Sequence, residues 1–228
     1  MTTVNDDQGS VETGAESSRL FYVEDKPIDV DLVNALLAYS RAQNQWPNFG
    51  PVSQRFEREI AEFVKLDQGL SVVACSSGTA ALHGLVALQE TLAGKPLRWV
   101  TSAFGYYCTI QGPLQDAKVA DCDGSAMLDL SQLNPDDFDG IIVTNIFGMS
   151  ATIEQYVKYA DTHGKVLCID AAMALGSHSH IANECISFHH TKPWGFGEGG
   201  CAIVATEHEA LCRSLICFGY QMDGQINR

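Results

Sequence analysis

The chain has 228 residues, of which 46% are hydrophobic and 18% are charged, a composition typical of a globular protein with one substantial core. Its formal net charge of −14 argues against nucleic-acid binding, because phosphate contacts need clustered Lys and Arg side chains. The most apolar stretch, residues 71–88, is interrupted by polar residues, so we expect no membrane span.

The N-terminal residues and the cysteines indicate the compartment. Residues 1–19 are acidic and polar without an apolar stretch, which predicts a disordered tail rather than a secretion signal. We expect one domain over residues 20–228. The eight cysteines fall singly within apolar runs and form no C-x-x-C pair, so we expect reduced, buried thiols in a cytoplasmic protein and no metal site.

Taken in chain order, the pattern starts with helices and then alternates strands with helices. Helical spacing of apolar residues is found at residues 28–39 and, after a break rich in Pro and Gly, at residues 52–64. We expect strands at 70–75, 97–101, 118–122, 140–144, 165–169, 186–188 and 201–205, and helices at 80–92, 106–114 and 152–163. The alternation predicts an α/β fold with a mostly parallel sheet flanked by helices, and a site at the carboxyl ends of its strands.

A candidate phosphate site lies between the strand at 70–75 and the helix at 80–92. There Ser77, Gly78 and Thr79 combine a hydroxyl-bearing turn, a position where the backbone can approach a ligand, and the free N–H groups at the start of a helix. The same residues also serve as an ordinary helix N-cap, and the two interpretations are compatible.

Two further candidates follow strands. Asp170 ends the run at 165–169, where a carboxylate would lie at the edge of the binding crevice; the alternative is a carboxylate that caps the next turn. Tyr106 follows the strand at 97–101, and core packing is the alternative role for its ring.

Lys192 lies in a turn between the short strands at 186–188 and 201–205. A solvated turn residue is the simplest interpretation of such a lysine. An amine that is partly desolvated, in contrast, can condense with an aldehyde and can also act as a base.

These residues stand in motifs that resemble one family. S-S-G-T-A-A-L at 76–82, D-A-A-x-A-x-G at 170–176 and S-F-H-x-T-K at 187–192 followed by G-E-G-G resemble the DegT/DnrJ/EryC1/StrS family of sugar aminotransferases, which use pyridoxal phosphate (PLP). The resemblance implies a fold-type I PLP-transferase large domain with a seven-stranded type of sheet. It also implies that Lys192 is the catalytic Schiff-base lysine and that the cofactor is held by Ser77, Gly78, Thr79, Tyr106, Asp170, Met173, Ser187, His189 and Asn227.

The match departs from the family in three respects. Met173 stands where the family usually has a glutamine near the phenolic oxygen of the cofactor, and a thioether is a weak acceptor. Ala103 replaces a proline. The resemblance also leads us to expect that this chain lacks the small C-terminal domain of family members, as a natural truncation, as one part of a split enzyme or because the sequence was cut.

The resemblance implies an aminotransferase that acts on a keto group of a nucleotide-linked sugar, with an amino acid of the glutamate type as donor. It also implies a homodimer. The alternative is a non-catalytic PLP-fold subunit that stabilises or regulates a full-length partner. Met173 and the missing domain favour that alternative, whereas Lys192 and Asp170 favour the enzyme, because a buried amine and carboxylate are costly without a function.

Overall fold

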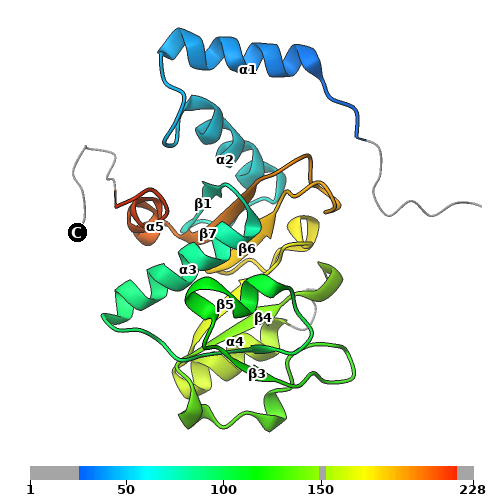
Figure 1. Ribbon diagram of the computed structural model, residues 1–228, viewed down its shortest axis with the longest axis vertical. Helices are drawn as coiled ribbons and strands as arrows, with labels where there is room; N and C mark the ends of the chain where they lie inside the picture. The colour runs from blue at the N-terminus through cyan, green and yellow to red at the C-terminus, as the bar shows by residue number, and fades with distance from the viewer. Residues whose placement is uncertain (1–25, 149–152, 220–228) are drawn as a thin grey trace, which may run out of the picture.

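A seven-stranded sheet forms the centre of the computed structural model, which describes residues 26–148 and 153–219. The strand order is β1-β7-β6-β5-β4-β2-β3 (Figure 1). Only β7 runs antiparallel to its two neighbours, so the predicted α/β fold with a mostly parallel sheet is confirmed. The strands are β1 Leu70–Cys75, β2 Trp99–Ser102, β3 Lys118–Ala120, β4 Gly140–Thr144, β5 Val166–Asp170, β6 Glu184–Ser187 and β7 Gly200–Ala205.

Helices cover both faces of this sheet. Side chains alternate between the two faces along each strand, so both faces carry apolar side chains that pack against helices. Towards α3 and α5 the strands direct Val73, Ile142, Cys168 and Cys185. Towards α2 and α4 they direct Val72, Ile141, Ile169 and Ile186. The helices are α1 Val30–Gln43, α2 Pro51–Phe63, α3 Gly78–Ala93, α4 Ile153–His163 and α5 Glu209–Ile216.

Local sequence signals explain where the helices begin. Asp29 accepts a hydrogen bond from the Leu32 amide at 2.9 Å and caps α1. Pro51 is the first residue of α2, where its missing N–H costs nothing. Helix α3 ends at Gly94, whose φ of 66° suits glycine.

The helix predicted over residues 106–114 is wrong. The segment instead forms two short 3-10 helices, Tyr107–Ile110 and Gly112–Leu114, separated by the extended Gln111. Gly112 has a φ of 58°, and Pro113 lacks the N–H that a continuous helix would use. The predicted strand at 118–122 is shorter, since β3 ends at Ala120.

The ends of the chain add two findings. Helix α5 was not predicted. Helix α1 forms as predicted, although it begins at Val30 rather than Ile28; it lies beyond α2 in Figure 1, with Val30 61% and Leu37 52% exposed. Residues 1–19, predicted as a disordered tail, lie outside the described residues. All eight cysteines carry free thiols, but Cys75 and Cys122 are only partly buried, so the prediction of buried thiols holds for the other six. Among the helices that the structure describes, none has the length and apolarity needed to cross a bilayer.

Candidate active site

The predicted functional residues meet at one edge of the sheet. Strands β1 and β6 both pair antiparallel with β7, and β6 pairs parallel with β5, so the carboxyl ends of β1, β5 and β6 lie at the same edge. Asp170 ends β5 and Ser187 ends β6. The loop that follows β1 carries Ser77 and Gly78 into α3.

This loop packs very closely against the neighbouring strands. A Cβ atom on Gly78 would lie 2.7 Å from Cβ of Ser187, and one on Gly200 would lie 2.3 Å from the carbonyl carbon of Ser77. Both contacts are shorter than real Cβ atoms allow, so only glycine fits at these two positions. The Ser77 loop and the Ser187 hydroxyl are thereby brought together.

The start of α3 gives this corner a partial positive charge. Ser77 caps the helix by accepting a hydrogen bond from the Ala80 amide at 3.1 Å. The first amides of an α-helix have no intrahelical partner and point out of its N-terminus, which attracts anions. Hydroxyl groups, a close backbone and a helix N-terminus together make a cradle suited to a phosphate group.

Asp170 is buried, with 2% of its surface exposed. Its Oδ1 accepts a hydrogen bond from the Ala172 amide at 3.2 Å and lies 3.8 Å from the Cys185 thiol, while its Oδ2 lies 3.9 Å from the Cys108 thiol. Burial raises the pKa of the Asp170 carboxyl, and the Ala172 amide and the charge of Lys192 act against this shift. The carboxylate is therefore poorly solvated and suited to a buried cationic partner.

Lys192 lies close enough to Asp170 for its charge to act on that carboxyl. It belongs to the hairpin loop between β6 and β7, which confirms the predicted strand-turn-strand arrangement. Its Nζ lies 5.9 Å from the ring centre of Tyr106, and its charge acts on the Asp170 carboxyl. The Tyr106 ring is 65% exposed, so it is not a core residue.

Beside Asp170, the end of β4 carries buried polar atoms. Thr144 pairs with Asp170 in the strand register. Within residues 26–148 and 153–219, the Thr144 hydroxyl and both polar side-chain atoms of Asn145 are buried and find no hydrogen-bond partner. Unsatisfied buried groups are costly, and their concentration beside a buried carboxylate fits a site built around a polar ligand.

The remaining predicted cofactor residues are His189, Met173 and Asn227, and the His189 amide donates a hydrogen bond to Ser187 Oγ at 3.2 Å. His189 contacts its own loop, with Nδ1 2.8 Å from the Thr191 hydroxyl and Nε2 3.4 Å from Glu198. Met173 is half-buried in the turn after β5. Asn227 lies outside the described residues.

Two kinds of contributor at the site were not predicted: a pair of thiols and a lysine. Cys108 and Cys185 flank Asp170, and burial raises the pKa of the Cys108 thiol to about 12. Alternation along β6 could have placed Cys185 and Ser187 on one face of the sheet. The pairing of Cys185 with Asp170, however, depends on the register between β5 and β6, which the local sequence does not determine. The second contributor is Lys26, whose ammonium contacts the Lys192 loop.

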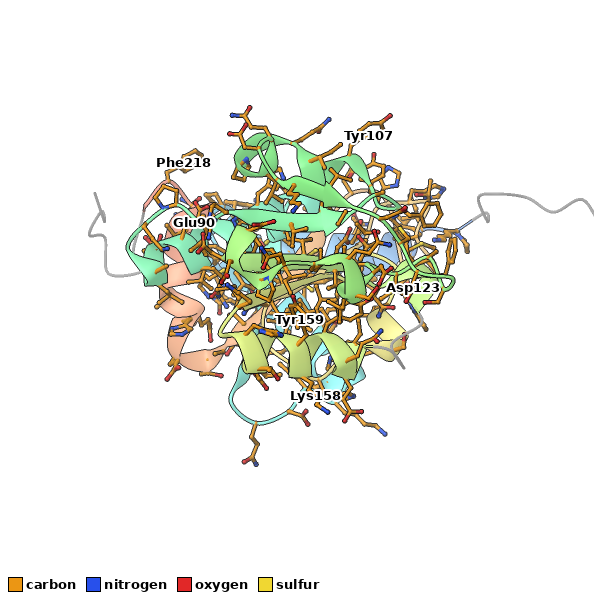
Figure 2. The ribbon with its side chains drawn as sticks, turned by 90° about the horizontal axis from the view of Figure 1, so that it is seen from below. Glu90, Tyr107, Asp123, Lys158, Tyr159 and Phe218 are labelled. Carbon is orange, nitrogen blue, oxygen red and sulfur yellow. The ribbon has the colours of Figure 1, made fainter. Side chains whose placement is uncertain are left out.

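An amine, a buried carboxylate, an exposed ring and an anion cradle therefore lie at the same edge of the sheet. The cluster of polar groups fits pyridoxal phosphate, which needs a phosphate cradle, an anion for its ring nitrogen and an amine for its aldehyde. No group of three or more His, Cys, Asp or Glu side chains in the described ranges 26–148 and 153–219 could hold a metal ion. Figure 2 shows Tyr107, the neighbour of Tyr106, at the outer rim of the molecule.

Comparison with known proteins gives a consistent result. Residues 29–226 match the model of the DegT/DnrJ/EryC1/StrS aminotransferase family. A pleiotropic regulatory protein of Geobacillus stearothermophilus is 27% identical over 189 residues, which cover 75% of this chain and 49% of that protein. The chain thus spans about half the length of the curated relatives it matches.

Solved structures share the fold. PseC of Helicobacter pylori, an aminotransferase involved in the biosynthesis of pseudoaminic acid, superposes with a TM-score of 0.73 at 19% identity, covering 91% of this chain and 59% of PseC. DesI, solved in the presence of its TDP-sugar product, gives a TM-score of 0.71 at 24% identity, covering 88% of this chain and 53% of DesI. These superpositions match the mostly parallel seven-stranded sheet and its flanking helices.

Proposed function

Since the chain belongs to the DegT/DnrJ/EryC1/StrS aminotransferase family, we propose that it binds pyridoxal phosphate and transfers an amino group to a keto group of a nucleotide-linked sugar. An amino acid of the glutamate type is the proposed donor. The observation that carries the proposal is the convergence of Lys192, Asp170 and the cradle of Ser77, Gly78 and Ser187 at one edge of the sheet.

The cradle is proposed to hold the phosphate group. Ser77 and Ser187 offer hydroxyls, Gly78 leaves the backbone accessible, and Thr79 lies at the start of α3. Asp170 is proposed to pair with the ring nitrogen, since a buried carboxylate gains most from a cationic hydrogen-bond donor. When bound, pyridoxal phosphate supplies an electron sink that stabilises negative charge at the α carbon of an amino acid.

Lys192 carries the proposed proton transfer. Its Nζ lies 5.9 Å from the centre of the Tyr106 ring, and its charge acts on the Asp170 carboxyl. From this position it is proposed to hold the cofactor, and then to take a proton from the α carbon of the donor and return it on the cofactor side. The Tyr106 ring is proposed to stack on the flat face of the cofactor, which its exposure permits.

The substrate class rests on the family and on relatives. DesI was solved with a TDP-sugar product, and the proposal extends nucleotide-sugar binding to this chain. We also propose a homodimer, because large apolar side chains remain exposed near the site: Tyr107 by 67%, Phe147 by 68% and Trp194 by 49%. Exposed aromatic clusters of this kind mark interfaces.

A half-reaction tests the proposal directly. The chain is loaded with pyridoxal phosphate, freed of excess cofactor and mixed with glutamate, and 2-oxoglutarate is measured against the amount of protein. We expect about one equivalent from the wild-type chain and none from Lys192→Ala. Cofactor binding without any 2-oxoglutarate from several amino acids would instead favour a non-catalytic PLP-fold subunit, the function that Met173 at the position of a glutamine supports.

A further inference from the structure

The ammonium group of Lys26 lies within a cluster of three main-chain carbonyls. Its Nζ donates to Gly195 O at 2.6 Å, to Lys192 O at 2.8 Å and to His190 O at 3.1 Å. A lysine ammonium has three N–H donors, so these bonds use its full donor capacity. Lys26 precedes the first helix, whereas all three carbonyls belong to the loop between β6 and β7.

The carbonyls converge because of the way the loop turns. The Lys192 amide donates to His189 O at 2.8 Å, and the Gly195 amide donates to Lys192 O at 2.9 Å. These tight turns leave carbonyl oxygens facing one point, where their dipoles repel one another. A cation at that point relieves the repulsion, since charge-assisted hydrogen bonds are shorter and stronger than neutral ones.

One of the three carbonyls belongs to Lys192 itself. The Lys26 ammonium therefore holds the main chain of the residue whose side chain carries the amine. At the base of the loop, hydrogen bonds from Phe188 N to Gly199 O and from His190 N to Gly197 O hold its two arms together. Lys26 is thus a tertiary contact at the tip, where it adds to the turn bonds within the loop.

We propose that Lys26 is a positioning residue, which anchors the loop 188–199 so that the Lys192 amine stays beside Asp170 and Tyr106. The role of Lys192 in this statement rests on the proposed function, but the anchor itself does not need the cofactor. After Lys26 the backbone is restricted by the ring of Pro27, and Asp29 then caps the start of α1. The contacts of Lys26 thus join the loop 188–199 to the segment that leads into α1.

Hydrogen exchange of the cofactor-free chain tests the anchor. We compare the wild type, Lys26→Met, Lys26→Arg and the control Lys158→Met, which alters an exposed lysine that points away from the sheet on α4 (Figure 2). Lys26→Met should speed exchange of the amides in 188–199 about tenfold or more, because charged hydrogen bonds are lost there. Exchange in β5 should not change, Lys26→Arg should restore part of the protection, and Lys158→Met should match the wild type.

Two exchange results would overturn the proposal. Unchanged exchange of residues 188–199 in Lys26→Met would mean that the ammonium anchors nothing. Faster exchange spread evenly over the sheet, with the Arg variant no better than the Met variant, would mean that Lys26 supports the fold in general rather than this loop.

Cofactor attachment provides the second readout. Each variant is titrated with pyridoxal phosphate, reduced with borohydride, and the fraction labelled at Lys192 is measured by peptide mass spectrometry. Lys26→Met should need about tenfold more cofactor for half-labelling, and Lys26→Arg should lie between it and the wild type. Equal labelling of Lys26→Met and wild type would overturn the positioning role. If the wild type is not labelled although Lys26→Met frees the loop, the proposed function fails and the anchor stands.

Discussion

Gly78 and Ser187 are in such close contact that a Cβ atom on Gly78 would lie 2.7 Å from Cβ of Ser187. The contact joins the loop after β1 to the end of β6 across the intervening strand β7. It forms the proposed phosphate cradle and also makes that cradle intolerant of a single added methyl group.

Gly78→Ala should therefore weaken cofactor binding. Either the loop or Ser187 must move to accept the methyl group, and both carry the proposed phosphate contacts. We expect the dissociation constant for pyridoxal phosphate to rise about tenfold or more, which is about 1.4 kcal/mol, in a titration followed by absorbance. Gly124→Ala is the matched control, since nothing lies within 4 Å of a Cβ atom at Gly124. Equal affinities of Gly78→Ala and Gly124→Ala for pyridoxal phosphate would show that its phosphate group does not bind beside Gly78 and Ser187.

Asp170→Asn should raise the stability of the cofactor-free fold and lower its affinity for pyridoxal phosphate. Burial raises the pKa of the Asp170 carboxyl in the folded chain above its ordinary value of 3.8. Below that value the carboxyl is protonated in both states. As pH rises through the window up to the raised pKa, the unfolded chain releases its proton first and the folded wild type loses stability. The neutral amide has no such loss.

Thermal unfolding of the cofactor-free chain at a series of pH values measures this difference. The stability gained by Asp170→Asn should grow as the pH rises above the ordinary value of 3.8 and should level off above the raised pKa. The affinity of this variant for pyridoxal phosphate should fall about tenfold, because the ring nitrogen loses its anionic partner. A variant that is less stable than the wild type at pH 8 would show that the carboxylate is already satisfied without a ligand.

Arg213→Met should destabilise the fold strongly. Arg213 donates to both carboxylate oxygens of Glu57, at 2.7 Å and 2.9 Å, and Glu57 also accepts from the Ala74 amide at 2.8 Å. The exposed fractions of the two side chains are 13% and 8%, so removal of the arginine leaves a buried carboxylate unpaired. We expect a loss of about 3–5 kcal/mol in the free energy of unfolding by urea.

A double variant and a surface pair control this experiment. Glu57→Gln added to Arg213→Met should recover part of the loss, because it neutralises the stranded carboxylate. Arg55→Met, which breaks an exposed pair with Glu59, should cost less than about 1 kcal/mol. Similar losses in Arg213→Met and Arg55→Met would mean that the buried network does not hold α2, β1 and α5 together.

The strands and most helices could be predicted because their signals are local. Apolar runs bounded by turn residues located all seven strands, and the Ser77 cap located the start of α3. Residues 106–114 misled the prediction because apolar spacing suggested a helix, whereas Gly112 and Pro113 interrupt it. Helix α5 was missed because its 8 residues give only a short periodic pattern. Its contact between Arg213 and Glu57 joins residues that are far apart in the sequence, so no local signal marks it.

The site was predictable only in part, for a related reason. Asp170, Ser187 and Lys192 stand in sequence motifs, and their residue types indicate the chemistry that each can perform. Cys185 reaches Asp170 through strand register, and Lys26 reaches Lys192 across 166 positions of the chain. Contacts of that kind depend on tertiary structure, so neither the buried thiols at the carboxylate nor the ammonium in the loop could be inferred from spacing.

The most direct test of the account is the site of covalent attachment of the cofactor. The wild-type chain is incubated with pyridoxal phosphate, reduced with borohydride and mapped by peptide mass spectrometry, with Lys192→Ala and Lys158→Met in parallel. We expect one fixed cofactor per chain on Lys192 in the wild type and in Lys158→Met, and none in Lys192→Ala. Labelling scattered over surface lysines and undiminished in Lys192→Ala would contradict it.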